Sequence, residues 1–139
     1  MSYQHYRRKK AMLIFQSKNK ELTDKAVKKS LAQLGFKLEK NIDPKTISDV
    51  WGRGVMAFEY QVETTPKTNF TTTDFKKELE TKLATYAKKH QLESYEGNKI
   101  FEVSDIWIKD DLIHFDISYL VNKATVEYVK DMHTLEENN

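Results

Sequence analysis

Four side chains in the last third of the chain have the types and spacing for acid–base or metal chemistry: Asp105, Trp107, His114 and Asp116. Two carboxylates beside an imidazole can ligate a divalent metal ion, or can shift each other's pKa and act as a general acid and base. Asp105, His114 and Asp116 are therefore the candidate metal ligands. The corresponding activity would be metal-assisted hydrolysis.

These side chains share a site only if a predicted hairpin has one particular register. The apolar, β-rich runs 100–108 and 112–121 flank Lys109-Asp110-Asp111, a spacing that predicts a β-hairpin. A two-residue turn at Asp110 and Asp111 would pair the two candidate aspartates with each other and the tryptophan with the histidine. A three-residue turn would shift the register by one and separate the carboxylates. The simpler interpretation is a set of polar residues on the open face of an antiparallel sheet.

A second candidate surface is basic and lies in the first 30 residues. Rings that can stack on bases alternate there with cations that can neutralise phosphates. The residues that we expect to contact nucleic acid are Tyr6, Arg7, Arg8, Lys9, Lys10, Lys25, Lys28 and Lys29. The alternative is that residues 1–9 form a flexible, solvated basic arm that keeps the protein in solution.

A third candidate is Arg53, which stands between Gly52 and Gly54. Glycine on both sides lets backbone amides approach an anion closely, and the guanidinium adds two parallel donors. The alternative is structural, because a glycine that ends a short helix and a glycine that precedes a strand would give the same pattern.

The amino-acid composition limits which partners and which chemistry the chain can have. The chain has 139 residues, no cysteine and a formal net charge of +2. Residues 1–54 carry 13 Lys and Arg against 5 Asp and Glu, whereas residues 55–139 carry 10 against 16. This asymmetry indicates a basic surface for an acidic partner, unless the two halves interleave in the fold. Without cysteine, neither disulfides nor thiolate chemistry is possible.

Other functional classes lack their sequence patterns. Four glycines in the whole chain leave no glycine-rich phosphate loop, and no serine lies in a nucleophile elbow. The four histidines share no metal-ligand spacing. No cofactor is expected, and no apolar run approaches the length of a membrane span or of a signal-peptide core. We therefore expect a cytoplasmic protein, and the composition suits a small accessory protein of a bacterium or phage.

The first third of the chain is expected to form strand, helix and strand. Residues 11–15 are apolar on both faces, which is typical of a buried strand. Residues 23–34 have apolar side chains at helical spacing, with Thr23 as the expected cap and Gly35 as the end. Residues 36–39 alternate and predict a short second strand.

The remaining elements follow in the same way. We expect a short helix over residues 44–51 after Asp43, a strand over 56–62, and a helix over 71–90 that begins at a capping-box-like Thr71 and Asp74. The hairpin comes next. A final element over 123–135 is predicted as a helix capped by Asn122, although its valines and tyrosine also allow a strand.

These elements predict a single α+β domain over residues 1–139, with residues 136–139 as a frayed tail. The expected architecture is a two-layer sandwich: a mainly antiparallel sheet, two principal helices on one face in a ferredoxin-like or related arrangement, and a carboxyl-terminal helix. The function that fits best is a non-enzymatic binding module for nucleic acid or for a protein partner, including a second copy. The alternatives are the hydrolase and a structural assembly protein.

Overall fold

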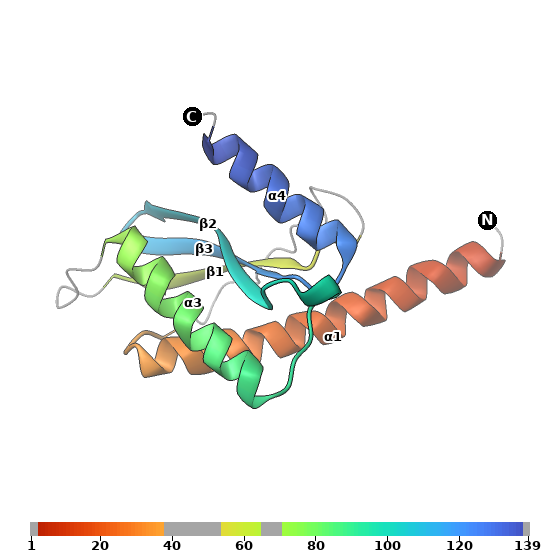
Figure 1. Cartoon of the computed structure of the whole chain (residues 1–139), viewed down its shortest axis with the longest axis horizontal. Helices are drawn as coiled ribbons and strands as arrows, with labels where there is room; N and C mark the ends of the chain where they lie inside the picture. Colours follow the sequence, from red (N-terminus) through yellow and green to blue (C-terminus); the bar gives the residue numbers. More distant parts are fainter. Residues whose placement is uncertain (1–2, 38–53, 65–70, 138–139) are drawn as a thin grey trace.

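The computed structural model describes residues 3–37, 54–64 and 71–137. Their elements are α1 (Tyr3–Gln33), β1 (Ala57–Glu63), α3 (Thr72–Lys89), a 3-10 turn η1 (Tyr95–Gly97), β2 (Phe101–Lys109), β3 (Leu112–Tyr119) and α4 (Lys123–Glu137). Figure 1 shows a small sheet between two helical layers, with α1 and α3 on one side and α4 on the other. The α+β class is confirmed.

The main correction concerns α1, which replaces the expected strand at residues 11–15, the expected loop after it and the start of the expected helix at 23. No glycine or proline occurs before Gly35, so nothing in residues 1–34 interrupts a helix. Thr23 lies inside the helix, where its hydroxyl donates to the Asn19 carbonyl at 2.7 Å. The prediction that Thr23 caps a helix is therefore wrong.

The predicted end of this helix at Gly35 is confirmed. Gly35 has a φ of +85°, which glycine adopts without strain. The amide of Phe36 then donates to the Leu31 carbonyl at 2.9 Å and closes the last turn. Phe36 and Lys37 belong to no strand, and the rest of the predicted strand 36–39 lies outside the described residues. The predicted helix 44–51 also lies outside them.

The sheet is antiparallel, with β3 between β1 and β2. The hairpin is confirmed in the two-residue register, because Lys109 pairs with Leu112 around a turn made by Asp110 and Asp111. Both turn residues have positive φ, 54° and 62°, as a type I′ turn requires. A β-bulge interrupts β2 at Ser104. The described residues hold three strands, so a four-stranded ferredoxin-like arrangement is not confirmed.

The main core lies between the sheet and the layer formed by α1 and α3. Phe75 of α3 packs edge-on against Phe36 and against Phe115 of β3, with ring centroids 5.3 Å apart in both pairs. α3 begins as predicted, since the Asp74 amide donates to the Thr71 hydroxyl at 3.1 Å. These contacts hold α1 and α3 together on one face of the sheet, as expected.

The carboxyl-terminal element is a helix, and it lies on the other face. Val126, Tyr128 and Val129 of α4 form a second buried cluster with Ala57 and Leu120. The sheet is therefore covered on both sides at this end, rather than on one side as in a two-layer sandwich. Of the predicted frayed tail, residues 136 and 137 end α4, and 138–139 lie outside the described residues. No helix among the described ranges is long and apolar enough to span a membrane.

Candidate functional site

The basic candidate surface lies on a single helix, α1. All eight residues proposed for it from the sequence are exposed: Tyr6, Arg7, Arg8, Lys9, Lys10, Lys25, Lys28 and Lys29. α1 carries nine Lys and Arg against two acidic residues, a net charge of +7. The first acidic residue is Glu21, so residues 3–20 contain six cations and no carboxylate. This half of the helix is a strong local source of positive potential.

The amino-terminal segment of α1, Tyr3–Phe15, extends beyond the sheet. Every residue in it is exposed, whereas the buried residues of α1 all lie between Asn19 and Leu31. In Figure 1 the red end of the helix runs past the other drawn elements toward the amino terminus. Residues 1–9 were expected to be a flexible arm, and residues 3–9 are helical here. The segment is about 20 Å long, at 1.5 Å per residue.

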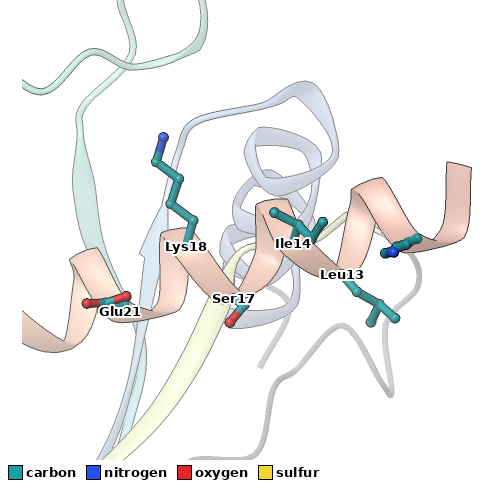
Figure 2. A pocket seen from close by; sticks show the side chains of 6 residues that line it. Leu13, Ile14, Ser17, Lys18 and Glu21 are labelled. Carbon is teal, nitrogen blue, oxygen red and sulfur yellow. The ribbon is translucent and has the colours of Figure 1, made fainter. Parts of the chain in front are cut away.

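The same segment exposes large apolar side chains. Tyr3 is 74 % exposed, Ile14 60 % and Leu13 57 %. Figure 2 shows Leu13 and Ile14 on α1 together with Ser17, Lys18 and Glu21. The described residues that line a shallow hollow of about 540 Å³ at this place all belong to α1. The Arg7 guanidinium lies 5.7 Å from the centroid of the Tyr3 ring, within range of a cation–π contact.

The hairpin brings together the acidic and aromatic side chains that its sequence predicted. Asp105 pairs with Asp116, and Trp107 pairs with His114. The Trp107 and His114 rings are stacked, with centroids 5.3 Å apart and an angle of 10° between their planes. On the other side of β3, Glu59 of β1 pairs with Asp116. Three carboxyl-bearing residues therefore lie in one row across the sheet.

Asp116, in the middle of this row, is almost fully buried, with 5 % of its surface exposed. Burial, followed by the nearby carboxylates of Asp105 and Glu59, raises its pKa to about 8. Burial also raises the pKa of Asp105, and Glu136 of α4 adds to the increase, although the Ile106 amide opposes it by donating to Asp105. At neutral pH the Asp116 carboxyl is therefore mainly protonated.

Two further groups complete this polar cluster. Tyr128 of α4 has a raised pKa because it is buried and because Asp116 and Asp105 are near. Glu59 Oε1 lies 3.8 Å from His114 Nδ1, a distance for charge attraction but not for a hydrogen bond. Asp116 Oδ1 and His114 Nδ1 are buried and have no hydrogen-bond partner among the described residues.

The three candidate metal ligands, Asp105, His114 and Asp116, belong to this cluster. Although Asp105, His114 and Asp116 lie on one face of the sheet, the described ranges contain no group of three or more His, Cys, Asp or Glu side chains arranged to hold a metal ion. Its chemistry is that of a buried carboxylic acid beside two acidic neighbours. The candidate anion ligand Arg53 lies outside the described residues.

Sequence reasoning missed Glu59 and Tyr128 as members of this cluster, and Leu13 and Ile14 as exposed side chains. Glu59 lies in the strand predicted over residues 56–62, but no local pattern shows that this strand pairs with β3. Leu13 and Ile14 belonged to a run that was interpreted as buried. Comparison with known proteins found no matching family model, no matching curated protein and no matching solved structure.

Proposed function

We propose that this protein is a non-enzymatic binding module that binds nucleic acid through the amino-terminal segment of α1. The observation that carries the proposal is that Arg7, Arg8, Lys9 and Lys10 are held on an exposed helix that extends from the rest of the described chain. A phosphate backbone complements this charge, and the release of condensed counterions would drive binding.

The second half of α1 extends the same surface. Arg7, Lys10, Lys18, Lys25 and Lys28 are separated by intervals of 3, 7 or 8 residues, which place them on one side of the helix. Among the described residues, one exposed ion pair offsets this charge, between Lys25 and Glu21 at 3.5 Å. Such an exposed pair contributes little and is screened by salt. The basic side of α1 thus remains available to phosphates.

Fluorescence anisotropy with labelled oligonucleotides, measured from low to physiological salt, tests the proposal. We expect binding that weakens steeply with salt, and near-complete loss of binding in the variant R7A/R8A/K9A/K10A. The matched control is K76A/K77A/K88A/K89A, which removes four lysines from helix α3 and changes the net charge equally, from +2 to −2. Equal binding by the two variants, or no binding by the wild type at any salt, would refute the proposal.

The exposed Leu13 and Ile14 favour a second candidate, self-association as a structural or assembly protein. Neighbouring exposed aliphatic side chains on a projecting helix are typical of a surface that packs against protein. Sedimentation velocity over a range of concentrations, with L13S/I14S for comparison, tests this candidate. A concentration-dependent oligomer that the substitutions abolish would support it, and a monomer at all concentrations would exclude it.

A further inference from the structure

We propose that the ligand is single-stranded nucleic acid, which lies along the side of α1 that faces away from the core. This inference rests on the proposed function and specifies its ligand. It starts from the buried side of α1, which carries Asn19, Thr23, Ala26, Val27, Ser30 and Leu31. Successive residues of an α-helix are rotated by about 100°, so the direction of every other side chain relative to this side follows from its position.

The cations of α1 that face away from the core form one row. At about 100° per residue, they lie within about 40° of the direction opposite the centre of the buried side. The row consists of Arg7, Lys10, Lys18, Lys25 and Lys28, all of which are exposed. Its two ends are 21 positions apart, so the row is about 31 Å long. Arg8 and Lys9 lie outside it, toward the buried side of the helix.

Two exposed aromatic rings accompany the first cations of this row. Tyr3 is 74 % exposed and Tyr6 is 56 % exposed. Each ring lies one helical turn before a cation, Tyr3 before Arg7 and Tyr6 before Lys10. Residues four apart are neighbours on the surface of a helix. Each ring and its cation therefore offer a stacking surface for a base beside a positive charge for a phosphate.

This combination favours a single strand over a duplex. Aromatic side chains bind nucleic acid by stacking on bases, and the bases of a single strand are accessible to them. The bases of a duplex are paired and stacked on one another, and exposing one costs free energy. A flexible strand can also follow a straight row of cations, whereas each backbone of a duplex winds around the helix axis.

A membrane surface suits the row less well. A helix that lies in the membrane interface buries an apolar face between the headgroups. Ile14 lies in the row, but Met12, Leu13 and Phe15 project about 100° or more away from its centre. The row therefore presents its cations without the apolar face that would anchor the helix in a bilayer.

The first test compares three ligands at physiological salt: labelled oligothymidine, the same strand paired with oligodeoxyadenosine, and vesicles of phosphatidylcholine and phosphatidylserine in equal parts. Anisotropy measures the first two, and cosedimentation measures the third. We expect the single strand to bind at least about fivefold more tightly than the duplex, because one stacked base contributes about that factor or more. Equal or tighter binding of the duplex would overturn the inference and leave the proposed function intact. Binding of the vesicles alone, or of none of the three, would refute both.

The second test asks whether the two rings stack on bases. The variant Y3L/Y6L loses both rings and Y3F/Y6F keeps them, and neither variant changes the charge. We expect the leucine variant to bind oligothymidine about 25-fold more weakly than the phenylalanine variant, since each of two stacked bases contributes about fivefold or more. Equal affinities of the two variants would show that the rings do not contact bases.

The third test asks which side of α1 the strand follows. R7A/K10A removes two cations of the row, and R8A/K9A removes two cations outside it with the same change of charge. We expect R7A/K10A to reduce the slope of log affinity against log salt for oligothymidine by about 1.4, since each lost phosphate contact contributes about 0.7. We expect R8A/K9A to reduce it by less than half of this. Equal effects of the two variants would overturn the one-sided contact.

The far end of the row tests how much of α1 the strand follows. K25A/K28A removes two cations of the row from the half of the helix that packs on the sheet. We expect it to reduce the slope for oligothymidine by about 1.4 as well. An unchanged slope would overturn a contact along the whole row.

Discussion

Asp105 and Asp116 pair directly across the β2–β3 ladder, on the face of the sheet that α4 partly covers. Like charges opposite each other on a sheet destabilise it when both are ionised. The arrangement is tolerated because burial keeps Asp116 mainly protonated at neutral pH, with its pKa at about 8. The cluster therefore links the stability of the fold to pH.

The first prediction is that stability decreases as the pH rises from about 4 toward 8. The pKa of Asp116 is raised from 3.8 in the unfolded chain to about 8 in the folded protein, so the folded state binds more protons over this interval. Its contribution to the free energy of unfolding then falls by up to about 1.4 kcal/mol per pH unit and levels off above pH 8. Urea unfolding at pH 5, 6, 7, 8 and 9 measures this slope.

The control for this prediction is Asp116→Asn, which has nearly the same shape and does not titrate. Other carboxylates change the free energies of unfolding of the wild type and the variant alike. The titration of Asp116 is therefore measured by the difference between these two free energies at each pH. We expect the variant to gain stability relative to the wild type as the pH rises through the same interval. Parallel stability curves from pH 5 to 9 would contradict the assignment.

The second prediction concerns the hairpin turn. Asp110 and Asp111 both have positive φ, where asparagine and glycine are less strained. The Thr64 amide and hydroxyl donate to the backbone carbonyl of Asp111, at 3.1 and 2.9 Å, and any side chain leaves that acceptor in place. We expect D110N/D111G to increase the free energy of unfolding by about 0.5–1 kcal/mol in thermal or chemical unfolding.

A β-branched residue gives the opposite control for the turn. Asp111→Val must take the same positive φ with a side chain that resists it, and we expect a loss of about 1 kcal/mol or more. If the valine and glycine variants are equally stable, the turn does not have this conformation.

Local sequence patterns predicted the elements whose stabilising contacts are close in the chain. The Thr71 cap of α3, the end of α1 at Gly35 and the two-residue hairpin turn each depend on residues within a few positions of one another. The relation between Glu59 and Asp116 is different, because these residues are 57 positions apart and meet only when β1 pairs with β3. Sequence alone therefore predicted the Asp105–Asp116 pair but not the third carboxyl group.

The misassignment of residues 11–15 has a related cause. A five-residue apolar run is compatible with a strand or a helix. The strand was predicted on the assumption that the side chains of residues 11–15 are buried. Leu13 and Ile14 are exposed, so the assumption failed. Ala11, Met12 and Leu13 are good helix formers, and the absence of glycine and proline before residue 35 was the more informative pattern.

The third prediction is that Asn122 stabilises the contact between α4 and the residues that precede β1. Its Oδ1 accepts from the Thr125 amide at 3.0 Å, and its Nδ2 donates to the Gly54 carbonyl at 2.7 Å. Thr125 Oγ1 in turn accepts from the Met56 amide at 2.8 Å. We expect Asn122→Ala to lower the free energy of unfolding by about 2 kcal/mol, because it removes the helix cap and the hydrogen bond to the Gly54 carbonyl.

Asp at position 122 separates the two roles. Asn122→Asp keeps the acceptor for the helix cap and loses the donor to Gly54, so we expect a cost of about 1 kcal/mol in urea unfolding. The expected order of stability is wild type, Asp variant, Ala variant. An Asp variant as unstable as the Ala variant would show that the cap contributes nothing.

The fourth prediction concerns the contact that joins α1 to the sheet. The Tyr60 hydroxyl donates to Asp24 Oδ1 at 2.6 Å, while Asp24 Oδ2 accepts from Lys20 at 2.9 Å. Tyr60 is buried in the main core. Water therefore cannot replace Asp24 as the hydrogen-bond partner of the Tyr60 hydroxyl without a cost in free energy. We expect Tyr60→Phe to lower the free energy of unfolding by about 1.5–2 kcal/mol, which is the lower part of the usual range for a hydrogen bond to a charged group.

A double-mutant cycle isolates this interaction. Tyr60→Phe and Asp24→Ala, alone and together, should give a coupling energy of about 1 kcal/mol or more in chemical unfolding. Lys20→Ala serves as a comparison, because its partly exposed ion pair with Asp24 should contribute less than about 1 kcal/mol. A coupling energy near zero would mean that the Tyr60 hydroxyl does not hold α1. The basic segment would then depend on the apolar contacts of Ala26, Val27 and Leu31 for its position beside the sheet.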